Sequence, residues 1–72
     1  MEQRIIDQQL NVLRDKVLLL GGRTEVAVQK AMESLINRDS GLAQQVLDDD
    51  KIIDQMELEI DRELSSIIAR RQ

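Results

Sequence analysis

The chain of 72 residues contains no cysteine, histidine, proline or aromatic residue. Without cysteine it forms neither a disulfide nor a thiolate metal site, and without histidine it lacks the commonest transition-metal ligand and general base. Without Phe, Tyr or Trp it has no platform on which the bases of single-stranded nucleic acid stack. Fourteen acidic residues against ten basic ones give a net charge of −4, which disfavours binding to phosphate backbones. We therefore expect no nucleic-acid partner.

Long hydrophobic runs are also missing. The longest one, Val17–Leu20, has four residues, whereas a membrane span needs about 20. The first nine residues are polar and contain no apolar signal core. We expect no direct membrane insertion and a cytoplasmic location.

Helix-forming residues dominate the chain, and its apolar side chains follow helical spacing. Steps of four and three along the first half are typical of the seam of a packed helix. A second stripe at every seventh residue runs beside the first, so the apolar face is wide and suits a bundle of three or four helices. The first stripe is Ile6, Leu10, Leu13, Val17, Leu20, Thr24, Ala27, Ala31 and Leu35, and the second is Ile5, Val12, Leu19 and Val26.

A break at residues 37–41 divides the chain into two predicted helices, at about 3–37 and 40–70. Asp39 is predicted to cap the second helix by accepting backbone N–H groups of its first turn. If the chain folds back about Asp39, residues lie opposite one another where their numbers sum to about 78. The predicted core stripe of the second helix is Leu42, Val46, Ile53, Met56, Ile60 and Ile67.

A two-helix hairpin of this size cannot cover its own apolar surface. Each helix of about 30 residues is roughly 45 Å long at ~1.5 Å per residue, and exposed apolar surface of that extent marks an interaction site. The hydrophobic core of a chain shorter than about 70–80 residues rarely contributes more than ~3–5 kcal/mol to the stability of the fold. We predict an all-α fold, in which a long antiparallel helical hairpin is completed by self-association into a homo-oligomeric multi-helix bundle.

Acidic residues interrupt an otherwise apolar stripe on the second helix. Leu47, Asp50, Asp54, Glu57, Asp61, Leu64 and Ile68 lie three or four residues apart and share one face. Like charges at i,i+4 repel by a few tenths of a kcal/mol per pair, and carboxylates without His or Cys select hard cations. The predicted metal ligands are Asp50, Asp54, Glu57 and Asp61, for iron, manganese or magnesium; the alternative is a solvated acidic face with lateral salt bridges.

Gly21 and Gly22 face the acidic stripe in this pairing. Two glycines in a helix interior cost about 1.5–2 kcal/mol relative to two alanines. They either let the backbones approach or leave room for a bound ion, or they mark a kink or simple close packing. No nucleophile–base pair or pocket is evident, so we predict that the chain is not an enzyme and has no catalytic residues.

Three segments of the chain resemble the PhoU family, which comprises bacterial regulators of phosphate uptake. They are LRDKVLLLGGRTE at 13–25, NRDSGLAQQVLDDDKIIDQMELEID at 37–61, and IIARRQ at 67–72. The most specific part is D-x-x-I-D-x-M-E-x-x-I-D at 50–61. The similarity covers nearly the whole chain.

The resemblance implies a repeat built as a three-helix bundle, usually present twice per protein. It also implies a negative regulator that links the phosphate ABC transporter to the sensor histidine kinase of the phosphate-starvation response. Family members bind metal clusters through E/D-x-x-x-D motifs. Glu57 and Asp61 match that motif directly, and Asp50 and Asp54 match its general form.

The chain departs from the family pattern in length. A third helix with a second acidic motif follows in the family, so residues 1–72 are expected to form a single partial PhoU-like repeat, as a fragment or a truncated relative. Three hypotheses for function stay open. The first is a regulatory module of phosphate homeostasis, the second a purely structural oligomerisation hairpin, and the third a small carboxylate metal-binding bundle.

Overall fold

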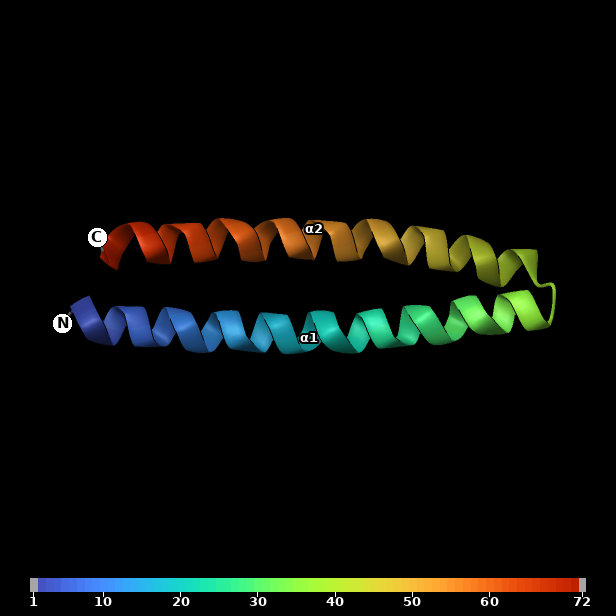
Figure 1. Cartoon of the computed structure of the whole chain (residues 1–72), viewed down its shortest axis with the longest axis horizontal. Coiled ribbons are helices and arrows are strands. Elements are labelled where there is room, and N and C mark those ends of the chain that lie inside the picture. Colours follow the sequence, from blue (N-terminus) through green and yellow to red (C-terminus); the bar gives the residue numbers. More distant parts are fainter. Residues whose placement is uncertain (1, 72) are drawn as a thin grey trace.

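The computed structural model describes residues 2–71, and side chains over residues 3–70. Helix α1 spans Glu2–Ile36 and helix α2 spans Ser40–Arg71. Figure 1 shows the two helices side by side and antiparallel, with the turn at one end and both chain termini at the other. The prediction of an all-α antiparallel hairpin is confirmed, and the observed helix bounds differ from the predicted ones by at most one residue.

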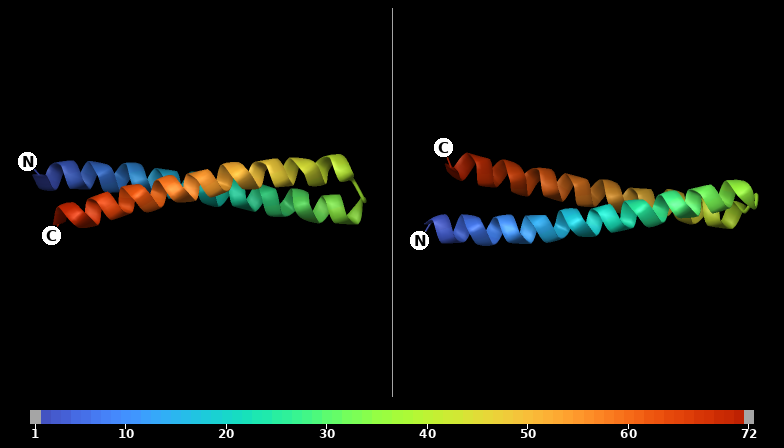
Figure 2. Two further views of the ribbon diagram at one scale, coloured as in Figure 1. Left: turned by 90° about the horizontal axis from the view of Figure 1, so that it is seen from above. Right: turned by 60° about the horizontal axis from the view of Figure 1, so that its bottom comes forward.

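The hairpin is long and only two helices thick. Its extents are 54 × 15 × 13 Å and its radius of gyration is 16.5 Å, whereas a compact domain of this length has a radius of gyration of about 11 Å. The helices cross at a shallow angle, as the two views of Figure 2 show. Within residues 2–71, neither helix combines the length and the hydropathy that a membrane span requires.

The turn is closed by backbone hydrogen bonds at the end of α1. The N–H of Asp39 donates to the carbonyl of Ser34 at 2.9 Å, and the N–H of Arg38 donates to the carbonyl of Leu35 at 3.4 Å. These two bonds form a Schellman motif, in which the residue at the Arg38 position adopts the left-handed conformation. Arg38 has a φ of 50° there, which is sterically unfavourable for a residue with a Cβ.

Asp39 begins α2 immediately after that motif. Its Oδ1 accepts a hydrogen bond from the N–H of Leu42 at 3.0 Å, and its carbonyl accepts one from the N–H of Ala43 at 3.1 Å. The predicted N-cap is therefore confirmed, and it satisfies a backbone donor that would otherwise lack a partner. One residue thus serves both helix ends, which is why the connection is so short.

The seam, meaning the line of α1–α2 contact, contains the predicted residues of α2. Ile53 and Ile67 are buried, and the other four members of the predicted stripe are half-buried. On α1 the prediction is only partly right, because Leu10, Val17 and Leu35 are exposed. The seam side of α1 consists of Ile6, Gln9, Leu13, Lys16, Leu20, Ala27, Lys30, Ala31 and Ser34, all buried or half-buried.

The difference on α1 has a physical cause. A single neighbouring helix covers a narrower strip of α1 than a bundle would cover. The covered strip includes Lys16 and Lys30, whose ammonium groups reach carboxylates of α2. Leu10 and Val17 consequently lie on the flank of the hairpin rather than in its seam.

Candidate functional site

Two ion pairs lie in the seam among apolar side chains. Lys16 donates a hydrogen bond to Glu63, and the Nζ of Lys30 lies 3.5 Å from the Oδ2 of Asp49. The residue numbers of both pairs sum to 79, one more than the sequence predicts. The same register therefore holds along the middle of the hairpin.

The Lys16–Glu63 pair is partly shielded from solvent. The hydrogen bond from Lys16 to Glu63 raises the pKa of Lys16 above its ordinary value of 10.5, and the charges of Glu63 and Glu59 act in the same direction. Desolvation opposes this shift. The carboxylates of Glu63 and Glu59 thus both favour the charged form of Lys16.

The four predicted metal ligands lie along one exposed flank of α2. Asp50, Asp54, Glu57 and Asp61 all have exposed side chains. Helical spacing places Leu64 and Ile68 of α2 on the same side, with Leu10 and Val17 of α1 facing them across the hairpin. We call this surface the acidic flank. Among the side chains that the structure describes, no group of three or more acidic residues is arranged to hold a metal ion.

The described residues therefore do not form a complete metal site. The four carboxylates are spread along several helical turns of α2, and no described acidic residue of α1 forms a group of three or more with them. Metal binding at these positions stays a prediction, and it requires ligands from outside this hairpin.

The glycine pair does not serve the packing of the two helices. A Cβ added at Gly21 or at Gly22 meets no atom within 4 Å. The α1–α2 contact therefore does not depend on missing side chains at these positions, and the interpretation that the two backbones approach there is wrong for the hairpin.

The opposite side of the hairpin carries the second predicted stripe. Ile5, Val12, Leu19 and Val26 of α1 have exposed fractions of 47–55%, and we call their surface the groove face. Two open hollows lie along it. One of about 420 Å³ is bordered by Ile5, Val12, Gln9 and Glu63, and the other of about 500 Å³ by Leu19, Val26, Arg23 and the Lys30–Asp49 pair.

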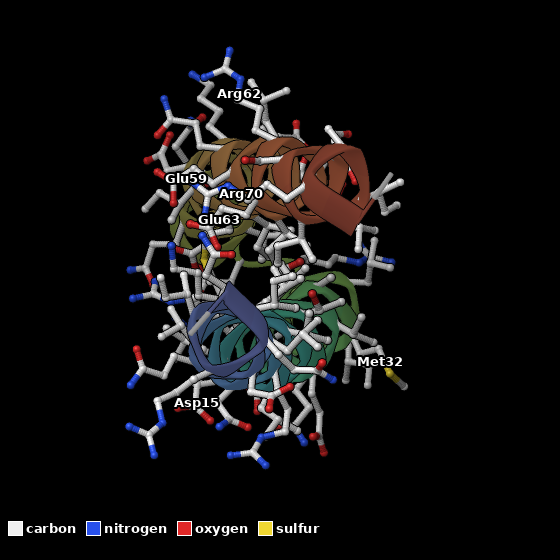
Figure 3. The ribbon with its side chains drawn as sticks, turned by 90° about the vertical axis from the view of Figure 1, so that its left-hand side faces the viewer. Asp15, Met32, Glu59, Arg62, Glu63 and Arg70 are labelled. Atoms are coloured by element: carbon white, nitrogen blue, oxygen red, sulfur yellow. The ribbon has the colours of Figure 1, made fainter. Side chains whose placement is uncertain are left out.

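Figure 3 shows the two sides from the end of the hairpin. Asp15 of α1 and Glu59 of α2 lie on the groove-face side, Met32 lies on the opposite side, and Arg62 points outward from α2 away from α1. Both flanks of the hairpin are therefore open, while the seam between the helices is closed.

Sequence reasoning missed the polar residues of the seam. Lys16, Lys30, Asp49 and Glu63 are invisible to a search for apolar stripes. A shared spacing could have revealed them. The two lysines of α1 are 14 residues apart, as are the two acids of α2, and the residue numbers of each pair sum to 79. Gln9 was missed as well, although its Oε1 is the one buried side-chain polar atom without a hydrogen-bond partner within the described part of the chain.

The fold and the exposed flanks define a two-helix module with exposed apolar side chains and a charged seam, as far as residues 2–71 show. Comparison with known proteins identifies the module more closely. A family profile for the PhoU domain matches residues 17–72, and the chain belongs to the PhoU family.

Several relatives carry names from phosphate transport. The chain is 48% identical over 71 residues to the phosphate-specific transport system accessory protein PhoU homolog of Pseudomonas aeruginosa, covering 93% of this chain and 29% of that protein. It is 38% identical over 64 residues to the phosphate-specific transport system accessory protein PhoU of Escherichia coli, covering 89% and 27%. It is 31% identical over 72 residues to the homolog of Clostridium acetobutylicum, covering 100% and 33%.

The chain spans about three-tenths of the length of these relatives. No solved structure matches it. The family is thus established by sequence.

Proposed function

We propose that the chain acts in the negative regulation of phosphate uptake and of phosphate-starvation signalling, as a protein-binding helical module without enzymatic activity. The observation that carries this proposal is the 48% identity to an accessory protein of the phosphate-specific transport system. The proposed partners are the phosphate ABC transporter and its sensor histidine kinase, and the proposed location is the cytoplasm.

The distribution of apolar surface supports a binding role. Sixteen large apolar side chains of the described residues are exposed, on both flanks of the hairpin. Exposed apolar side chains in this number favour protein–protein contact. Self-association of the chain is therefore part of the proposal, as is contact with the transport machinery.

Metal binding is proposed as a property of the acidic flank when further ligands are present. Asp50, Asp54, Glu57 and Asp61 would supply oxygen ligands, which suit iron, manganese or magnesium. All four of these acids lie on α2. The remaining ligands would therefore come from another segment or another chain.

A genetic experiment tests the regulatory role. Deleting the gene for this chain is expected to raise a phosphate-starvation reporter in cells grown with abundant phosphate, because a negative regulator is lost. Restoring the unaltered chain should return the reporter to its repressed level, and restoring a variant with Leu47→Asp and Leu64→Asp, in which two exposed apolar side chains of the acidic flank become charged, should not. A reporter that stays repressed after the deletion would contradict the proposal.

A further inference from the structure

The groove face is the more self-complementary of the two open flanks. Its four large apolar side chains are each one heptad apart, which is a spacing by which one helix packs along another. A hollow lies beside each half of this stripe. The stripe can therefore receive a helix that presents apolar side chains at the same spacing.

We propose that the groove face binds a second copy of this chain through a two-fold axis at the level of residues 15–16, with the two α1 helices packed antiparallel. This axis places Ile5 opposite Val26 of the partner subunit, and Val12 opposite Leu19 of the partner subunit. The hollow bordered by Ile5 and Val12 then faces, in the second copy, the hollow bordered by Leu19 and Val26. The inference extends the self-association proposed above by naming its surface and symmetry.

An unsatisfied polar atom supports this arrangement. The Oε1 of Gln9 is shielded from solvent and accepts no hydrogen bond within the described part of the chain, and leaving a buried acceptor unpaired costs about 1–3 kcal/mol. Gln9 borders the first hollow, whereas Arg23 borders the second. The two-fold axis brings Arg23 of the partner subunit to the level of Gln9, where its guanidinium donates to that oxygen.

The charges of α2 agree with the same axis. Figure 3 shows Glu59, Glu63 and Arg70 on the groove-face side of α2. The register of the hairpin places Glu59 within one helical turn of Arg70 of the partner subunit. Two carboxylates of each copy lie at the level of the axis, and each has a basic partner in its own chain: Glu63 is paired with Lys16, and the Oδ1 of Asp15 lies 3.4 Å from a guanidinium nitrogen of Arg14.

The acidic flank is unsuited to the same role. Its apolar ends are separated by Asp50, Asp54, Glu57 and Asp61, all exposed. A two-fold axis across its centre would set these carboxylates against their own copies, and like charges in close contact destabilise an interface. The second copy therefore belongs on the groove face.

Cysteine cross-linking distinguishes the two flanks, because the chain has no cysteine of its own. The variant Val12→Cys/Leu19→Cys is expected to form a covalent dimer under mild oxidation. Its two thiols cannot join within one helix, since seven residues span about 10.5 Å and a disulfide needs Cα atoms within about 7 Å. Each single variant should cross-link far less, because its thiol meets the other position of the partner subunit.

The matched control is Leu10→Cys/Val17→Cys, with the same spacing and similar exposure on the other flank. It is expected to stay uncross-linked. Equal or stronger cross-linking of this control would overturn the inference while leaving self-association intact, and a chain that sediments as a monomer with no cross-link would overturn both.

Charge reversal gives a second readout without cysteine. Arg23→Glu is expected to raise the Kd of the dimer about tenfold, which is the effect of losing ~1.4 kcal/mol. Arg62→Glu makes the same change of charge on the outer side of α2 and should leave the Kd nearly unchanged. Sedimentation equilibrium measures both, and equal effects would contradict the proposed surface.

Discussion

Lys16 of α1 and Glu63 of α2, which are 47 residues apart in the sequence, form an ion pair in the seam of the hairpin. Lys30 and Asp49 pair at the same sum of residue numbers, so the two ion pairs share one register. A slip of one residue would carry each charged group away from its partner and toward apolar neighbours. The seam thus combines a thin apolar core with two ion pairs, and we predict that these pairs favour the observed alignment.

Reversing one charge of this pair is expected to destabilise the hairpin. Lys16→Glu sets two carboxylates against each other beside Glu59, and Glu63→Lys sets two ammonium groups against each other. The double variant Lys16→Glu/Glu63→Lys should recover much of the lost stability because the attraction is restored. Thermal unfolding followed by circular dichroism measures all three, and a double variant no more stable than the singles would argue against a register role.

The pair also predicts a dependence of stability on pH. The pKa of Lys16 is raised above 10.5 in the folded chain, so its contribution is fully present below that pH and is lost as the pH rises through the folded value. The difference in melting temperature between the unaltered chain and Lys16→Met should therefore be largest near neutral pH and shrink above pH 10.5. Lys51→Met, which removes an exposed lysine, is the control, and a difference that grows at high pH would contradict the prediction.

Arg38→Gly is expected to stabilise the chain. Arg38 holds a φ of 50°, and a residue with a Cβ in that region costs roughly 1 kcal/mol that glycine does not. Arg38→Ala removes the side chain but keeps the Cβ, so it should not produce the gain. Chemical denaturation would measure the difference, and equal stability of the two variants would exclude backbone strain as the cause.

Gly21→Ala should also stabilise the isolated hairpin, by about 0.8–1 kcal/mol, which is the difference in helix propensity. An added Cβ there meets nothing within 4 Å. Gly21 lies on the side of the acidic flank by helical spacing, so the substitution leaves the proposed groove-face contact untouched. A loss of stability in denaturant would show that something packs against this glycine.

Substitution of the acids tests metal binding. Glu57→Gln/Asp61→Asn should weaken binding of manganese, iron or magnesium, and it should preserve or raise helicity because i,i+4 repulsion is removed. Titration calorimetry and circular dichroism measure the two effects. Absence of divalent-ion binding in the unaltered, self-associated chain would reject a site formed by copies of this chain, and Asp48→Asn, outside the predicted set, is the control.

Local interactions made much of the fold predictable. Helical periodicity, the lack of proline and the Asp39 cap depend on residues within one or two turns of each other, and these gave the two helices and the turn. The contact stripe of α2 was also predictable, because it is flanked on one side by acids that favour solvent. The position of Gly21 and Gly22 in open space was not, because it depends on how closely the partner helix approaches.

The amino-acid sequence by itself determined two helices, their antiparallel return, the family and the position of the acidic residues along α2. The tertiary structure alone decided which side of α1 meets α2. Apolar residues such as Val12 and Val17 lie on either side of that helix, and α2 covers only the band between them, which contains Leu13. That choice is also what leaves the groove face open, because a single helix can cover only one band of its neighbour.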